Sequence, residues 1–194
     1  MTLARHNDLH HTYAEYQTWP ATPRCELVDG RIYAMSPAPE VDHQRIVVAV
    51  ASQLYRQLAG HRCEVFSAPL DVRLPKPGQD DASTDTVVQP DVLVVCDPAK
   101  IDRRGVRGAP DWVAEVISPS SASHDLIRKR RAYEAAGVRE YWVIHATDRV
   151  VMVYDFEGGK FDVVDLEGSM AIGVLPGVRV DWTPIVEKLP PLEP

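Results

Sequence analysis

DWVAEVISPSS, residues 111–121, is a strand-forming apolar run that carries one acid, Glu115, in its middle. A similar run, VVQPDVLVV at residues 87–95, places Asp91 directly after Pro90. Both runs are apolar at even and at odd positions, which is typical of strands covered on both faces of a sheet. We therefore expect two buried strands, each of which carries a carboxylate.

The segments around these two strands predict the rest of the fold. Apolar residues recur at helical spacing from Val41 to Leu58, and residues 118–137 have the pattern of a second helix that ends at a glycine. Further strand patterns precede and follow both helices. The sequence therefore predicts an α/β (α+β) fold in which a mixed sheet lies between helices. We expect one domain over residues 1–194, with residues 189–194 as a frayed, Pro-rich tail.

Charge and hydropathy limit the function classes. The formal net charge of −7 argues against a protein that coats nucleic acid by bulk electrostatics, although basic residues gather locally at 100–107 and 128–131. No window approaches the roughly 18 consecutive apolar residues of a membrane span. The first twenty residues lack the apolar core of a signal peptide. We expect a cytoplasmic protein without a membrane partner.

The cysteines give no sign of a disulfide framework. Cys25, Cys63 and Cys96 are odd in number and far apart, and they form no C-x-x-C pair. We expect them to be reduced, buried thiols.

The two strand acids are the first candidates for chemistry. An ionised carboxylate in a buried strand costs several kcal/mol unless it is paired or binds a cation. A salt bridge or a turn hydrogen bond is the common explanation for a single buried acid. If the two strands are neighbours, however, Asp91 and Glu115 converge on a hard oxygen site suited to Mg²⁺ or Mn²⁺. A divalent metal held by two carboxylates favours hydrolysis of a phosphoester.

Such a site usually includes a cationic group. Two residues after Glu115 the strand returns to the same face, but that position is Ile117. The following helix offers Lys129, which shares the apolar face of Tyr133. An alternative partner for this lysine is Asp125, four residues earlier.

The other basic residues of that helix have a different predicted role, because they point mostly away from its apolar face. We expect them to contact backbone phosphates. They are Arg128, Arg130 and Arg131.

Together these residues resemble the PD-(D/E)XK nuclease superfamily, in the variant whose lysine has moved to the next helix. More closely, the chain is similar to the Uma-type family of restriction-endonuclease-like bacterial proteins. The similarity runs nearly end to end, through CELVDGRIYAMSPAPEVDHQRIV, VFSAPLDVRL, VVQPDVLVV, GAPDWVAEVISPSS, RKRRAYEAAGVREYWVI and LPGVRV. It implies a restriction endonuclease-like core, with a mixed sheet flanked by helices.

The resemblance also implies a site. Asp91 and Glu115 would bind Mg²⁺ or Mn²⁺ together with the backbone carbonyl of Val116, and Lys129 would be the catalytic lysine. The family pattern further contains Glu26 and His43. For Glu26 we favour a salt-bridge or turn role over a metal contact through water, and for His43 a hydrogen-bonded place in the core.

Three functions remain open from the sequence. The first is a metal-dependent DNA endonuclease, for which a homodimer is expected because two sites cut two strands most easily. The second is a catalytically weak or inactive binding module, or a defence-system partner, with the nuclease fold. The third is hydrolysis of a smaller phosphoester, which the acidic net charge favours.

Overall fold

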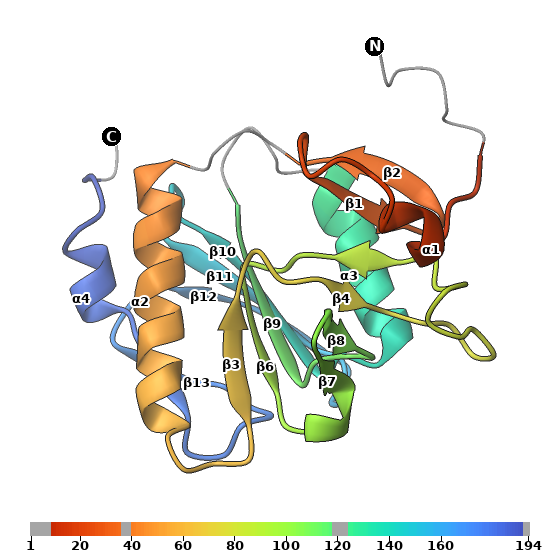
Figure 1. Cartoon of the computed structure of the whole chain (residues 1–194). Coiled ribbons are helices and arrows are strands. Elements are labelled where there is room, and N and C mark those ends of the chain that lie inside the picture. The colour runs from red at the N-terminus through yellow and green to blue at the C-terminus, as the bar shows by residue number, and fades with distance from the viewer. Residues whose placement is uncertain (1–8, 36–39, 118–123, 192–194) are drawn as a thin grey trace.

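The computed structural model describes residues 9–35, 40–117 and 124–191, with the side chains of residues 124–126 left out. Most strands of the described chain belong to two six-stranded sheets (Figure 1). The first, sheet A, has the order β2 (Arg31–Ala34), β1 (Cys25–Val28), β5 (Val87–Val88), β4 (Val72–Arg73), β8 (Gly105–Arg107) and β7 (Ile101–Asp102). The second, sheet B, has the order β12 (Lys160–Asp165), β11 (Val150–Asp155), β10 (Glu140–His145), β9 (Trp112–Ile117), β6 (Val92–Val95) and β3 (Glu64–Ser67).

The remaining elements are short apart from two helices. A two-stranded sheet is formed by β13 (Ser169–Ala171) and β14 (Arg179–Asp181). The helices are α1 (Tyr13–Tyr16), α2 (Val41–Gln57), α3 (His124–Ala136), α4 (Thr183–Val186) and the 3₁₀ turn η1 (Pro98–Lys100). The mixed sheet with flanking helices is thus confirmed, but the described chain divides its strands between two sheets that the sequence did not separate.

Sheet B is mixed because of one connection. Strands β9 and β10 pair in parallel, with Glu115 opposite Val143, whereas the other neighbours in this sheet pair antiparallel. Parallel neighbours need a crossover, and α3 provides it. The crossover carries α3 across the face of β9 that bears Glu115.

Two apolar clusters cover the two faces of sheet B. On one face α2 packs against residues of β6, β9 and β10, including Val92, Trp112 and Trp142. On the other face α3 and sheet A enclose residues such as Leu93, Val113 and Tyr141. In Figure 1, α2 and the β1–β2 hairpin accordingly stand on opposite sides of sheet B. Because side chains along β6 and β9 alternate between these two covered faces, both runs are apolar at even and at odd positions.

The β1–β2 hairpin owes its shape to its turn. Asp29 and Gly30 both have positive φ, 50° and 75°, as a two-residue turn between antiparallel strands requires. A Cβ on Gly30 would lie 2.3 Å from the ring of His10, so glycine is needed for space as well. The turn fixes the register that pairs Glu26 with Tyr33 and directs both side chains to one face.

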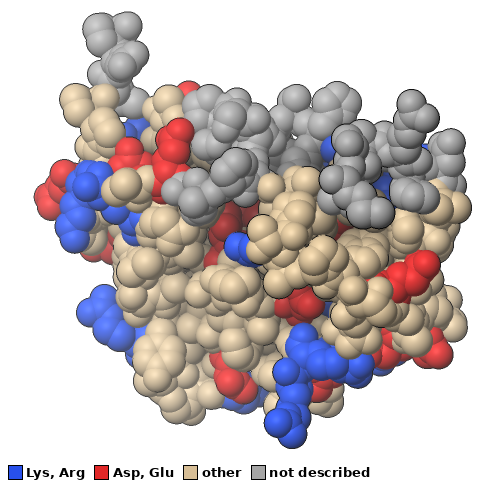
Figure 2. All heavy atoms as spheres, turned by 45° about the horizontal axis from the view of Figure 1, so that its top comes forward, with Lys and Arg blue, Asp and Glu red and all other residues tan. Residues whose placement is uncertain are grey.

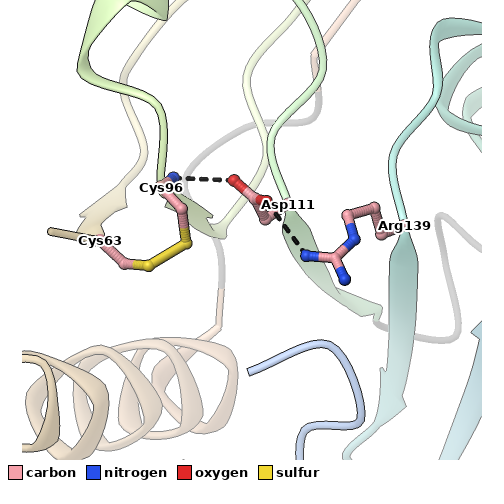
Figure 3. The surroundings of a disulfide bond; sticks show 4 residues. All are labelled: Cys63, Cys96, Asp111 and Arg139. Atoms are coloured by element: carbon pink, nitrogen blue, oxygen red, sulfur yellow. Dashed lines mark hydrogen bonds and ion pairs between the residues drawn. A yellow bond between two sulfur atoms is a disulfide. The ribbon is translucent and has the colours of Figure 1, made fainter. Parts of the chain in front are cut away.

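The expectation of reduced cysteines was wrong for two of the three. Cys63 and Cys96 form a disulfide bond (Figure 3). Their register explains it, because β3 and β6 pair Glu64 with Val95, and the cysteines occupy the next opposed positions. Cys25 is free and partly exposed.

The C-terminal residues and the helices were each the subject of an expectation from the sequence. Leu189, which we expected in a frayed tail, is buried in the cluster beneath α2. Within the described residues, no helix combines the length and the apolar character that crossing a membrane requires.

Candidate functional site

Strand register brings the two acids together. Strands β6 and β9 pair antiparallel, with Val92 opposite Ala114, and the same register continued by one residue places Asp91 opposite Glu115. The Asp91 side chain crosses to β9, where its Oδ2 accepts a hydrogen bond of 2.8 Å from the Val116 N–H. The predicted convergence of the two carboxylate-bearing strands is therefore present in the structure.

Lys129 reaches the same place from α3. Its Nζ lies 2.9 Å from Oε1 of Glu26 and 3.1 Å from Oε1 of Glu115, and the lysine is 7% exposed. The side chain of Asp125, the alternative partner, lies outside the described residues. Lys129 thus bridges carboxylates from β1 and β9, one from each sheet.

The position that could have carried the lysine is part of the core. Ile117 is buried with Val113 and Tyr133 in the cluster between sheet B and sheet A. A cation there would have to be desolvated among these apolar groups. The structure therefore gives a physical reason for an apolar residue at this position and places the cation on the helix above it.

Two contacts among the described residues hold Glu26 in place. Its Oε1 accepts a hydrogen bond of 2.8 Å from the backbone N–H of Gln89 and also faces Lys129. Glu26 is 3% exposed. Its contacts fit the salt-bridge role that we favoured, and they also make it a direct neighbour of Lys129.

Tyr133 is a site residue that the sequence reasoning did not identify as such. Its hydroxyl donates a hydrogen bond of 2.7 Å to Oε1 of Glu115, the oxygen that also faces Lys129. The signal that could have revealed it is its spacing, because Tyr133 follows Lys129 by four residues and shares its helix face. We had used this tyrosine only to mark the apolar face.

The burial of this cluster changes its acid–base chemistry. Desolvation raises the pKa of Glu115 to about 7, and the charges of Asp91 and Glu26 act in the same direction, while Lys129 and the Tyr133 hydroxyl oppose it. Burial and the nearby Glu115 charge also raise the pKa of Tyr133 well above its usual value. With Lys129 and Tyr133 as the groups that stabilise its charge, Glu115 therefore exchanges its proton near neutral pH.

His43 joins the cluster from the first turn of α2. Its Nε2 donates a hydrogen bond of 3.1 Å to Oδ2 of Asp91, since a carboxylate can only accept. Burial lowers the pKa of His43, but the hydrogen bond and charge of Asp91, the charge of Glu115 and the Val116 backbone outweigh it and raise the pKa overall. His43 therefore contacts a candidate metal ligand, and it is hydrogen-bonded as expected, but its side chain is 14% exposed and not fully buried in the core.

The three arginines of α3 lie in different surroundings. The Arg128 guanidinium stacks 4.1 Å from the ring centre of Tyr33, next to Glu26 in the hairpin register. Arg130 forms an ion pair of 3.0 Å with Glu134, and Arg131 is exposed. Of the three, Arg128 is the one placed against the β1–β2 hairpin, which carries Glu26.

The donor set fits a magnesium-like ion in chemistry. Carboxylate oxygens are ligands that Mg²⁺ prefers, and the described contacts place Oδ2 of Asp91 at the His43 Nε2 and the Val116 N–H, and Oε1 of Glu115 at Lys129 and the Tyr133 hydroxyl. Mg²⁺ commonly uses one or two protein carboxylates and fills its other positions with water or phosphate oxygens. In the described part of the chain, no three or more His, Cys, Asp or Glu residues are grouped to hold a metal by themselves. A cation would therefore depend on water or substrate for the rest of its shell.

The surface charge agrees with the acidic composition. On the face seen in Figure 2, Lys and Arg side chains occur in separate places among acids and uncharged residues and form no continuous basic surface. A nucleic acid that contacts this face would meet individual Lys and Arg side chains and not a continuous basic surface.

Comparison with known proteins agrees with this fold. Residues 13–183 match the Uma2 family, which is described as "Putative restriction endonuclease". A protein of Synechocystis sp. without an assigned function is 30% identical over 145 residues, which are 72% of this chain and 71% of that protein. The crystal structure of a "putative nuclease" from Anabaena variabilis superposes with a TM-score of 0.72 over 91% of this chain and 97% of that one, at 20% identity.

Proposed function

The chain belongs to the Uma2 family, and we propose that it is a DNA endonuclease that depends on Mg²⁺ or Mn²⁺. The observation that carries the proposal is the cluster at the start of β6, where it pairs with β9 in the interior of sheet B. Asp91 and Glu115 lie on paired strands, and Lys129 reaches Glu115 from the helix that follows. Two adjacent carboxylates with a buried cation form a general arrangement for hydrolysing phosphodiesters.

In this proposal each side chain has its own task. A bound divalent ion would polarise the phosphate and lower the pKa of water, and Asp91, Glu115 and the Val116 carbonyl would hold it. Lys129 would orient the attacking water and stabilise the negative charge that develops on the phosphate oxygens. His43 would keep Asp91 in place through the Nε2 hydrogen bond, and Tyr133 would do the same for Glu115.

A plasmid-nicking assay tests the proposal. Supercoiled DNA is incubated with the protein and Mg²⁺, Mn²⁺ or EDTA, and conversion to the nicked form is measured. We expect nicking with either metal and none with EDTA, and we expect Asp91→Asn and Glu115→Gln to abolish it. The matched control is Glu64→Gln, an exposed acid on strand β3 of the same sheet, which should nick as wild type does.

The alternative is a binding module that keeps the fold without turnover. The contacts of Lys129 favour this binding module, because its ammonium group already pairs with both Glu26 and Glu115 and is less able to act on a phosphate. If purified wild type binds DNA at low salt but nicks it with neither metal, the module is the better description. If the protein neither binds nor nicks DNA, both DNA functions are wrong.

A further inference from the structure

A cavity of about 410 Å³ opens beside the start of β1, within the usual size range of small-ligand pockets. Its walls are mainly aromatic and apolar, and three of its ten lining residues are prolines. The lining residues are Tyr16, Trp19, Pro20, Ala21, Pro23, Arg24, Cys25, Ile32, Pro69 and Gln89. Tyr16 and Trp19 contact each other with their ring centres 5.2 Å apart. The cavity therefore offers aromatic faces for a flat ligand to contact.

One wall of the cavity is polar and tightly ordered. The side-chain N–H₂ of Gln89 donates 2.8 Å to Oδ1 of Asp71 and 3.3 Å to the Tyr16 hydroxyl, while its carbonyl oxygen accepts from Arg24. The Tyr16 hydroxyl also donates 3.0 Å to Asp71. These hydrogen bonds hold the Tyr16 ring in place as one aromatic face of the cavity. Arg24 adds a positive charge at the rim.

The cavity lies next to the candidate site in the fold. The backbone N–H of Gln89 donates to the same Glu26 oxygen that faces Lys129. On the other wall, Ala68, the residue before Pro69, donates its N–H to the backbone oxygen of Asp91 at 3.2 Å. Cys25 and Glu26 are consecutive in β1, so their side chains leave the strand on opposite faces. The cavity and the carboxylates thus flank the first residues of β1.

We propose that this cavity binds an unstacked nucleobase of the DNA strand whose phosphate lies at Asp91 and Glu115. The proposal rests on the proposed function, because it takes DNA as the substrate. Aromatic side chains bind bases of any sequence by stacking, and an unpaired base can leave the helix more easily than a paired one. The enzyme should therefore prefer single-stranded or distorted DNA to regular duplex.

The fluorescence of Trp19 can report binding at the cavity without any catalytic turnover. The other three tryptophans, Trp112, Trp142 and Trp182, are fully buried, while Trp19 is partly exposed and lines the cavity. In EDTA, a twelve-residue oligothymidylate should quench the tryptophan fluorescence. An abasic strand of the same length should not, and it should bind less tightly. Equal quenching and equal affinity for the two strands would overturn the proposal.

Two variants separate the cavity from the fold. Trp19→Ala should weaken oligothymidylate binding, measured by anisotropy of a labelled strand, by about 5- to 100-fold, with little change for the abasic strand. Ile32→Phe fills the cavity but keeps Trp19 and an apolar strand residue, so it should weaken binding in the same selective way. If Ile32→Phe folds and binds oligothymidylate as wild type does, the cavity does not hold the base.

These measurements distinguish failure of the cavity from failure of the nuclease. Base-dependent binding without metal-dependent nicking would keep the cavity and reject the endonuclease. Metal-dependent nicking with equal affinity for both strands would keep the endonuclease and reject the cavity.

Discussion

Two buried cations in this protein, Lys129 and Arg73, each face two carboxylates. Arg73 lies 2.7 Å from Asp81 and 2.7 Å from Asp102, and its side chain is fully buried. Its partners reach solvent, with side chains 23% and 41% exposed, whereas Glu26 and Glu115 are 3% and 9% exposed. The negative charge therefore lies partly in solvent around Arg73 and is buried around Lys129.

We interpret that difference as one between a structural network and the network proposed to be catalytic. The hydrogen bond from Arg73 lowers the pKa of Asp102, so this carboxylate stays ionised and paired. The pKa of Glu115 rises to about 7, because burial and neighbouring acids outweigh Lys129. Carboxylates that reach solvent stay ionised beside their cation and stabilise a fold, while a buried excess of negative charge can accept a metal ion.

The largest expected effect is on catalysis at the second network. Lys129→Met removes the cation that would act on water and phosphate, and the nicking rate should fall on the order of 100- to 1,000-fold. The plasmid assay measures it, with the exposed Lys188→Met as control. If Lys129→Met does not fold, adding Glu26→Gln removes one uncompensated carboxylate. A loss below about threefold in a folded variant would mean that Lys129 is structural.

Arg73→Met should affect stability instead. It removes charged hydrogen bonds to two acids that can turn to solvent, so urea unfolding should show a loss of about 1.5–3 kcal/mol. Nicking by the folded variant should stay within about twofold of wild type. If folded Arg73→Met loses as much activity as Lys129→Met, the distinction between the two networks fails.

Tyr133→Phe should have a smaller effect on the network proposed to be catalytic. It deletes the hydroxyl that donates to Glu115 and should reduce both stability and metal affinity by about 1 kcal/mol. Manganese titration followed by electron paramagnetic resonance measures the affinity. The control is Tyr154→Phe on β11 of sheet B, whose ring is separated from Tyr133 by the ring of Tyr141. Unchanged manganese affinity in Tyr133→Phe would show that this hydroxyl does not position Glu115.

The pH dependence of stability should have opposite signs at the two networks. Glu115 has a raised pKa, so its contribution is present below pH 4.5 and is lost as pH rises through about 7. Asp102 has a lowered pKa, so its contribution is present above pH 3.8 and is lost as pH falls further. Urea unfolding in EDTA should show that Glu115→Gln flattens the slope between pH 5 and 8. Asp102→Asn should change the profile only in acid, and the reverse assignment of slopes would contradict the comparison.

The sequence predicted the parts of the site that local patterns determine. Asp91 and Glu115 stood out because an acid in a doubly apolar strand is costly, and the helix period selected Lys129 from its neighbours. The mixed sheet with flanking helices followed from the same periodicities. These inferences need only side-chain direction within one strand or one helix.

The features that the sequence did not reveal depend on packing between distant segments. The contact of Glu26 with Lys129 requires sheet A to dock over α3, and the Tyr133 hydrogen bond depends on the height of α3 above β9. The disulfide requires the register of β3 against β6, which no spacing between Cys63 and Cys96 encodes. Whether the cluster binds metal and cuts DNA stays a prediction.

The disulfide also determines how fragments of this protein would behave. It joins residues 33 positions apart, and the exposed loop at residues 75–80 lies between them. A single protease cut in that loop would leave two pieces covalently linked. They would run as one band on a non-reducing gel and as two after reduction, so the proportion that separates without reductant measures how many molecules lack the Cys63–Cys96 bond.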